Sequence, residues 1–257
     1  MRCRALSLLV ALALAAPLIA LGCRGQASEK QSMLAAAASL RNALPALISA
    51  HASKHPGAKI SATYGASGDL QKQVEGGAPI DGVIFANARP VDALVEKGLA
   101  DAGTRKVLAT NTLVLIGPKG GEPLTFATID AVPAAEKIAI GDPGAVPAGQ
   151  YAKAALQKLG KWEAIQGRLV FGGDVAAVLA YARRGEVAAA VVYRTEIQGV
   201  SDVALLDEAK GDWVPRVEVV AAAVKDAKAA SEANAFLDFV LSPEGQRVLA
   251  DFGFGPP

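Results

Sequence analysis

The chain has almost no cysteine and few aromatic residues. Its two cysteines, Cys3 and Cys23, lie in or next to an apolar N-terminal run, so the rest of the sequence has no thiol for a disulfide or a thiolate metal site. Aromatic residues make up 5% of the 257 residues, whereas hydrophobic residues make up 52%. The core must therefore consist mainly of alanine, valine and leucine, a composition that suits buried parallel strands and small-residue helices.

Neither sign of charge is in excess. The sequence has 26 Lys and Arg against 25 Asp and Glu, a formal net charge of +1. This balance excludes the broad basic field that nucleic-acid binding uses, and there is no acidic tail. We therefore expect no nucleic-acid partner.

Recognisable catalytic and metal-binding patterns are also missing. His51 and His55 have the i, i+4 spacing of a metal pair, but no third ligand is evident, and we interpret them as part of a solvated helix face. Gly65–Gly68 does not follow the G-x-S-x-G pattern of a nucleophile elbow. No pair of carboxylates indicates acid–base catalysis. We predict that the protein is not an enzyme, with a secreted hydrolase as the disfavoured alternative.

The N-terminus has the pattern of an export signal. A basic start, Met1–Arg4, precedes the apolar run Ala5–Leu21, which Pro17 makes a poor permanent membrane anchor. We predict a signal peptide over residues 1–22, a tether over 23–31, and a periplasmic or cell-surface location. The sequence before and including Cys23 is similar to a bacterial lipoprotein cleavage box, which predicts lipidation of Cys23. The alternative is ordinary cleavage beside an incidental cysteine.

From residue 32 onward, short apolar runs alternate with helical patterns, which predicts an α/β protein with mainly parallel sheets. The expected strands are Ser32–Ala38, Ala58–Tyr64, Gly82–Ala86, Thr112–Gly117, Lys137–Gly141, Arg168–Phe171, Val187–Tyr193 and Val217–Val224. The expected helices are Leu40–Lys54, Gly68–Glu75, Pro90–Lys97, Ala148–Leu159, Val175–Arg184, Ala230–Leu241 and Pro243–Phe252.

The loop Gly141–Gly149, GDPGAVPAG, leads directly into one of these helices. It has the glycine spacing of a phosphate loop, but Gln150 and Tyr151 stand where that motif needs Lys and Ser or Thr, which excludes an NTPase. A helix entered through glycine and proline presents free backbone N–H groups and a partial positive charge. It can therefore hold an anion without a cationic side chain.

Other strand-to-helix junctions offer donors of the same kind. Ligands of open α/β sheets sit at the carboxyl ends of the strands, beside the helix starts. Ser39 and Ser67 offer hydroxyl and N–H groups there, Ala148 and Val175 offer N–H groups, and Tyr193 offers a phenol. Each serine taken alone is more often a helix cap. In combination, the five residues predict an oxyanion site.

Several motifs together resemble the periplasmic molybdate-binding proteins of ABC importers. They are AAASL from Ala36, GASGDL from Gly65, GGAPID from Gly76, GDPGAVPAGQYAKAALQKLG from Gly141, GDV from Gly173, VVY from Val191 and the ending FLDFVLSPEGQRVLADFGF. The resemblance covers nearly all of residues 32–254.

The resemblance implies a type II periplasmic binding protein with two lobes joined by two crossing hinge strands. Lobe one would comprise residues 32–109 and 217–257, and lobe two residues 110–216. Molybdate, and also tungstate, would bind between the lobes at Ser39, Ser67, Ala148, Val175 and Tyr193, with no cofactor and no side-chain metal site. The implied partner is a membrane ABC permease, and the chain would act as a monomer. Sulfate or phosphate remains the alternative ligand.

Four positions depart from the family pattern. The family often has serine where Gly68 stands, so one accessory hydroxyl is missing, and Asn87 replaces a common acid. Phe85 replaces a small residue and is a candidate for crowding the cleft. Asp69 would repel a dianion unless its side chain turns outward.

Overall fold

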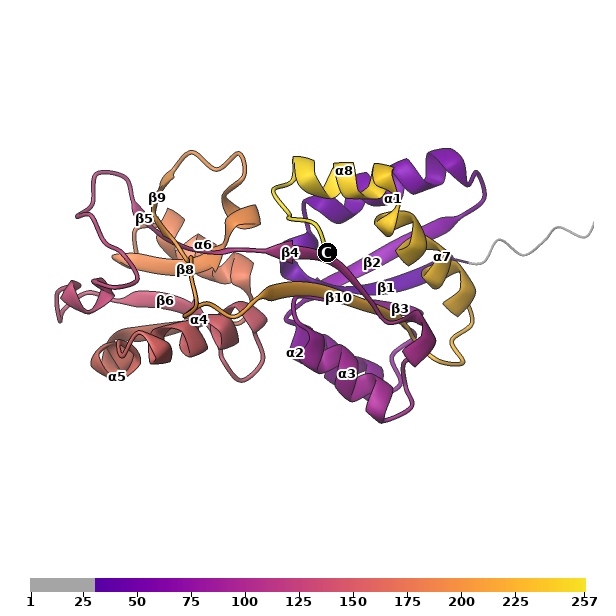
Figure 1. The fold of residues 1–257 in the computed structure, drawn as a ribbon, viewed down its shortest axis with the longest axis horizontal. Coiled ribbons are helices and arrows are strands. Elements are labelled where there is room, and N and C mark those ends of the chain that lie inside the picture. The colour runs from indigo at the N-terminus through magenta and orange to yellow at the C-terminus, as the bar shows by residue number, and fades with distance from the viewer. Residues whose placement is uncertain (1–30) are drawn as a thin grey trace, which may run out of the picture.

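The computed structural model describes residues 31–257. The described residues do not include the predicted signal peptide or Cys23. Of the predicted tether, they include only the last residue. Between Gln31 and Pro257, no helix is both long enough and apolar enough to cross a membrane. The described chain forms two α/β lobes side by side, each built on its own five-stranded sheet (Figure 1).

Lobe one is the half of the molecule that contains both ends of the described chain. Its sheet has the strand order β2-β1-β3-β10-β4. The strands are β1 (Gln31–Ala37), β2 (Lys59–Gly65), β3 (Gly82–Phe85), β4 (Lys106–Asn111) and β10 (Val217–Ala223). β1 pairs in parallel with β2 and β3, whereas β10 runs antiparallel to β3 and β4.

Helices cover both faces of the lobe-one sheet (Figure 1). They are α1 (Ala43–Lys54), α2 (Ser67–Glu75), α3 (Ala88–Glu96), α7 (Ala230–Leu241) and α8 (Pro243–Asp251). Helices α1, α7 and α8 pack on one face of the sheet, and α2 and α3 cover the other. Under α2 and α3, a second hydrophobic cluster includes Leu70, Leu94 and Phe85. Apolar residues fill both interfaces, so the sheet is buried on both sides, as parallel sheets require.

Lobe two repeats this plan with the strand order β7-β6-β8-β5-β9. The strands are β5 (Leu113–Pro118), β6 (Ile138–Gly141), β7 (Leu169–Gly172), β8 (Ala189–Tyr193) and β9 (Val203–Glu208). The helices are α4 (Pro147–Lys158), α5 (Trp162–Ile165) and α6 (Val175–Arg183). β6 is parallel to β7 and β8, and β5 runs antiparallel to β8 and β9. The predicted α/β class is confirmed; each sheet is mixed, with two parallel and two antiparallel pairings, so that four of its five strands run the same way.

The chain passes twice between the two sheets. It leaves lobe one between Asn111 at the end of β4 and Leu113 at the start of β5, and it returns between Glu208 and Val217 (Figure 1). The residue ranges given above for the lobes stay a prediction. Two covalent connections of this kind allow the lobes to move relative to each other as rigid bodies.

The structure corrects the interpretation of the two histidines. His51 is 3% exposed, and its ring packs edge-on against Phe236 and Phe239 of α7 while stacking on His55. The predicted solvated face is wrong for His51, because that side of α1 lies against α7 and α8. Residues 31–257 hold no cluster of three or more His, Cys, Asp or Glu that could bind a metal.

Candidate functional site

All five predicted site residues line one small cavity between the lobes. Ser39 lies in the 3-10 turn η1 (Ala38–Leu40) that follows β1, and Ser67 opens α2. Ala148 lies in the first turn of α4, Val175 opens α6, and Tyr193 ends β8. The space open to a water-sized probe between them is about 10 Å³. Room of that size is on the scale of one water molecule, so the cavity excludes drug-sized ligands and suits only a small ion.

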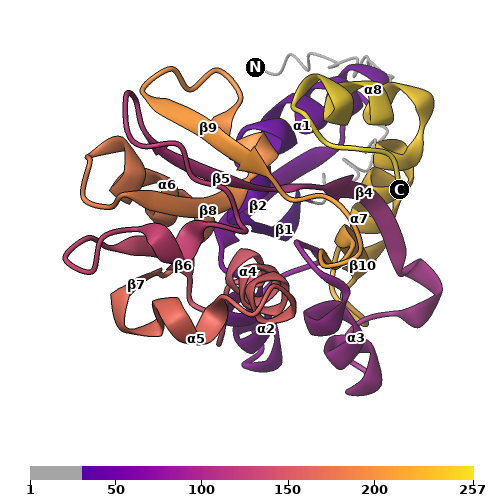
Figure 2. The ribbon, with the colours of Figure 1, turned by 60° about the vertical axis from the view of Figure 1, so that its left-hand side comes forward.

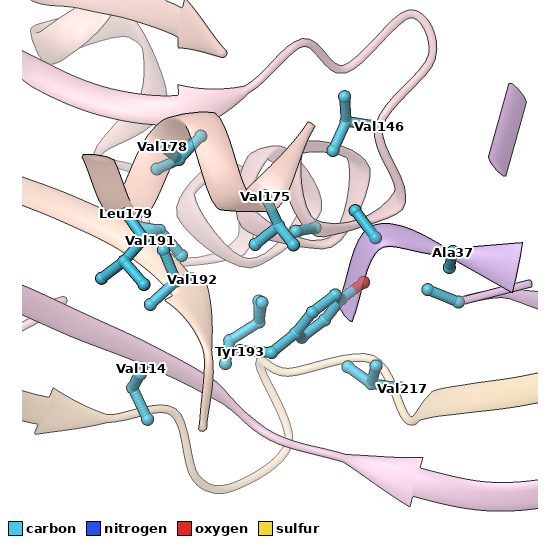
Figure 3. Packing of buried hydrophobic residues seen from close by; sticks show 14 of the residues in the cluster. Ala37, Val114, Val146, Val175, Val178, Leu179, Val191, Val192, Tyr193 and Val217 are labelled. Carbon is cyan, nitrogen blue, oxygen red and sulfur yellow. The ribbon is translucent and has the colours of Figure 1, made fainter. Parts of the chain in front are cut away.

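Three hydroxyl groups reach the cavity, and two of them have no partner. The Ser39 Oγ and the Tyr193 Oη are buried without a hydrogen bond to any other described residue. Figure 3 shows the Tyr193 hydroxyl directed toward the end of β1, where Ala37 is labelled. The Ser67 Oγ accepts a hydrogen bond from the Ala86 N–H at 3.2 Å, which leaves its own hydrogen free to donate. Burying an unpartnered hydroxyl is costly, so these groups point to an absent acceptor.

The serines are not helix caps, although that is the usual role of serine at such a junction. The N-cap residues of η1 and α2 are Ala37 and Ala66, neither of which can supply a side-chain acceptor. The N-cap of α4 is Val146, which also makes no side-chain cap. Helix starts without caps leave their first N–H groups unsatisfied. Three such starts converge on one cavity, and the dipoles of the two α-helices, α2 and α4, favour an anion there.

The loop before α4 positions the Ala148 N–H. The Asp142 carboxylate accepts a hydrogen bond from the Gly144 N–H at 2.8 Å, and the Asp142 carbonyl accepts one from the Val146 N–H at 2.7 Å. A side chain at Gly149 would place its Cβ 1.9 Å from the Gly141 oxygen. Only glycine therefore lets α4 begin so close to the end of β6. The loop fixes the direction in which the first turn of α4 points.

No cation lines the cavity within the described part of the chain. The single charged residue in its wall is Asp174, whose carboxylate caps α6 by accepting from the Ala177 N–H at 2.8 Å. Asp174 also forms an ion pair with Arg41 of lobe one at 3.9 Å. Burial raises the pKa of the Tyr193 phenol well above its usual value, with the Tyr151 and Glu196 charges adding to the effect. Tyr193 is therefore a neutral donor at physiological pH.

The lobes touch each other through residues next to those that line the cavity. The Gly68 N–H donates to the Ala145 carbonyl at 3.1 Å, and the Asn87 amide donates to the Gln150 side chain at 2.8 Å. The start of α2 thus lies beside the loop that leads into α4 (Figure 2). These contacts hold the two lobes in a closed arrangement.

These contacts give the departures at Gly68 and Asn87 a structural meaning. A Cβ at Gly68 would lie 2.9 Å from the Ala145 oxygen, so the residue without a side chain permits close contact between the lobes. Asn87 supplies a hydrogen bond to the opposite lobe, although its Oδ1 is buried without a partner in the described chain. Sequence reasoning missed both contacts, because the paired positions lie far apart in the chain and no local motif links them.

The other two departures lie away from the cavity. Phe85 is fully buried in the cluster under α2 and α3, and it does not line the cavity. It therefore does not crowd the site. The Asp69 side chain is 54% exposed and pairs with Lys72 at 3.2 Å. It turns outward, which removes the expected repulsion of a dianion at close range.

Known proteins resemble this chain over nearly its whole length. The model of the family described as bacterial extracellular solute-binding protein matches residues 33–255. A Bacillus subtilis (strain 168) protein provisionally named ABC transporter substrate-binding lipoprotein YvgL is 35% identical over 249 residues, 94% of this chain and 95% of that protein. The molybdate-binding protein ModA of Escherichia coli (strain K12) is 35% identical over 237 residues, 89% and 90% of the two chains.

A solved structure supports the same relationship at the level of the fold. The periplasmic molybdate-binding protein of Azotobacter vinelandii superposes with a TM-score of 0.80. The match covers 88% of this chain and 100% of that one at 21% sequence identity. The two-lobed architecture is therefore the one that this solved protein uses.

Proposed function

The chain belongs to the bacterial extracellular solute-binding protein family, and on that premise we propose that it binds molybdate between its lobes and delivers it to an ABC permease. Tungstate, with the same charge and shape, is the second expected ligand. The observation that carries the proposal is the set of unpaired donors in the cavity. The Ser39 and Tyr193 hydroxyls have no partner there, and the starts of η1, α2 and α4 have no side-chain cap.

We assign ligand contacts to Ser39 and Ser67 from lobe one and to Ala148, Val175 and Tyr193 from lobe two. A hydrogen bond to a charged partner contributes ~1.5–3 kcal/mol. Several such bonds, less the costs of desolvation and ordering, support a binding free energy on the order of −8 to −12 kcal/mol. The anion bridges both lobes and so stabilises the closed arrangement, which is the form that the permease recognises.

The donor set also bears on ligand choice. Each assigned contact is a hydroxyl or a backbone N–H that points at the anion, which suits a fully ionised tetrahedral oxyanion. A protonated phosphate carries an O–H group that needs an acceptor, and an unpaired buried O–H lowers affinity. Sulfate has the charge and shape of molybdate, so the size of the cavity must discriminate between them.

We further propose that the site binds without catalysing a reaction. Ser39 and Ser67 are the only alcohol nucleophiles among the residues lining the cavity, and no His or Lys lines it to act as a base. Asp174 is occupied in capping α6 and in pairing with Arg41. No cofactor is needed for binding of this kind. Incubation with generic ester and phosphate substrates should give no turnover, and measurable hydrolysis would contradict this part of the proposal.

The family is extracellular, and we place this chain in the periplasm or at the cell surface as a monomer. Lipidation of Cys23 would anchor it to the membrane beside its permease, with residues after Cys23 as the tether. Mass spectrometry of the mature N-terminus tests this assignment. A fragment that begins at Cys23 and carries acyl chains supports it, whereas an unmodified N-terminus contradicts it.

Thermal unfolding with a panel of anions tests the binding proposal. A ligand at about 100 times its Kd stabilises the folded state by about 2.7 kcal/mol. For a protein of this size, that corresponds to a rise in Tm of about 5–10 °C. We expect this rise with molybdate and tungstate, and little change with sulfate or phosphate at equal concentration. Equal shifts for all four anions would indicate nonspecific anion binding.

A further inference from the structure

Behind the anion cavity lies a buried carboxylate that the assigned ligand contacts do not use. Glu196 belongs to the 3-10 turn η5 (Arg194–Ile197), which directly follows Tyr193. Its residue is 7% exposed, and the influences on its pKa are burial and the charges of Asp174 and Arg41, with no hydrogen bond among them. A buried carboxylate without a hydrogen-bond partner is expensive to ionise.

Glu196 lines a second cavity whose walls come from both lobes. Ala38, Arg41 and Asn42 of lobe one form one side, and α6 and η5 of lobe two form the other. Ala38 also lines the anion cavity, so the two cavities adjoin. Separation of the lobes would remove one wall and expose Glu196 to water. The burial of this carboxylate therefore depends on lobe closure.

The charges that face Glu196 come from each element around it. Asp174 at the start of α6 repels its ionised form, and Arg41 from lobe one attracts it. Arg183 of α6 also lines the cavity, but it pairs with Asp202 at 2.8 Å.

The remaining neighbours do not supply a partner for Glu196. On its own turn, Arg194 pairs with Glu208 at 3.0 Å. On β8, Tyr193 is a neutral phenol whose pKa Glu196 helps to raise. The one cation that acts on Glu196 is therefore Arg41, which Asp174 shares.

We propose that Glu196 couples anion capture to proton uptake, because the lobes close over the anion most favourably when this carboxyl group is protonated. The inference rests on the proposed oxyanion binding. An ionised Glu196 would place a negative charge close behind the Tyr193 hydroxyl that is assigned to the dianion. It would also lose its hydration as the cavity closes. Protonation removes both penalties.

The direction and size of the effect follow from the ionisation of Glu196. In the closed arrangement, burial first and Asp174 second raise the pKa of Glu196 to about 7 from its usual 4.5. Opening of the lobes removes burial, the larger cause, and so moves the pKa back toward 4.5, while Asp174 stays beside Glu196 in lobe two. At a pH between these two pKa values, Glu196 is therefore protonated more often in the closed form than in the open form. Linkage then predicts that molybdate affinity falls about tenfold from pH ~6 to pH ~8, with about half a proton taken up per anion near pH 7.

Titration calorimetry with molybdate in two buffers of different ionisation enthalpy measures the proton uptake directly. For the unaltered protein near pH 7, we expect an uptake of about half a proton. Glu196→Gln, which mimics the protonated form, should abolish this uptake. It should also bind molybdate up to about 300-fold more tightly than the unaltered protein at pH ~8, because the ionised carboxylate opposes closure by the full difference between the two pKa values. Glu136→Gln is the matched control, since it removes the same charge from an exposed position of lobe two.

The possible outcomes separate the inference from the proposed function. Binding with no proton uptake, or uptake that Glu196→Gln leaves unchanged, would overturn the role of Glu196 while leaving molybdate binding intact. Uptake that Glu136→Gln also abolishes would overturn it as well. Absence of molybdate binding by the unaltered protein at every pH would refute the proposed function. If Glu196→Gln does not fold, an absence of proton uptake by the unaltered protein still overturns the inference.

Discussion

Replacing Tyr193 with phenylalanine isolates the contribution of one assigned donor. Tyr193 is 1% exposed, and its hydroxyl has no partner among the described residues. In the ligand-free protein, Tyr193→Phe therefore removes a buried polar group without breaking a hydrogen bond. We expect the free energy of unfolding to stay the same or to rise slightly, because an unsatisfied hydroxyl costs about 1–3 kcal/mol.

The same substitution should weaken anion binding. If the Tyr193 hydroxyl donates to the bound oxyanion, its loss costs ~1.5–3 kcal/mol, because the hydrogen bond has a charged acceptor. Converted to an equilibrium constant, the Kd for molybdate should rise by about 10- to 150-fold. The ring itself stays, so the packing between the lobes should be preserved. A change of this size without a loss of stability is the signature of a ligand contact.

Two measurements on the same preparation test this prediction. Urea unfolding without ligand gives the stability, and titration calorimetry gives the Kd for molybdate. Tyr181→Phe is the control, since Tyr181 lies on α6 outside the cavity and should change neither value appreciably. A Tyr193→Phe variant that is less stable but binds molybdate as tightly as before would refute the reasoning. In that case the hydroxyl would have a structural partner and no ligand.

Three further substitutions distinguish binding from structural roles. Ser67→Ala should lower both molybdate affinity and ligand-free stability. The free energy of unfolding in urea should fall by about 1 kcal/mol, because the Ala86 N–H loses its acceptor. Unchanged stability would contradict that hydrogen bond. Gly68→Ala should raise the molybdate dissociation rate about 2- to 10-fold in stopped-flow experiments, since its Cβ would press on the Ala145 oxygen; an unchanged rate would contradict the closing contact. Gly149→Ala should destabilise the ligand-free protein by about 1–3 kcal/mol or more, because no room exists beside Gly141; a neutral effect on urea unfolding would show that α4 can shift.

Local patterns predicted most of the fold. The apolar runs at β1, β3, β6, β8 and β10 are buried strands, and the helix starts at α4 and α6 fall within a residue of their expected positions. Pro45 lies in the first turn of α1, after the 3-10 turn η1, where a missing N–H costs no hydrogen bond. Alternating strands and helices with clear turn residues leave few topologies to choose from.

Two strands were not expected from the sequence. β4 (Lys106–Asn111) is interrupted by polar residues, and β9 (Val203–Glu208) ends in two acids at the edge of its sheet. Their pairing with β10 and β5 comes from tertiary context, which local periodicity does not record. The same limit applies to His51, whose burial depends on α7 and α8 packing against α1.

The candidate site likewise has parts that local sequence patterns predict and parts that depend on tertiary contacts. Ser39, Ser67, Ala148, Val175 and Tyr193 were identified because each stands at a strand end or helix start, and parallel topology brings such positions together. Their joint position in one cavity agrees with that reasoning. The contacts from Gly68 and Asn87 to the opposite lobe join positions tens of residues apart. Burial of Glu196 likewise depends on both lobes. None of these has a local sequence signal.

The most direct test of the central claim is a calorimetric titration of the purified protein with molybdate, repeated in the presence of excess sulfate. The neutral donor set predicts one site per chain with a Kd on the order of micromolar or tighter, and discrimination by cavity size predicts a Kd that sulfate does not shift. No measurable binding of molybdate, or displacement of molybdate by sulfate at comparable concentration, would contradict the assignment of this cavity as a selective molybdate site.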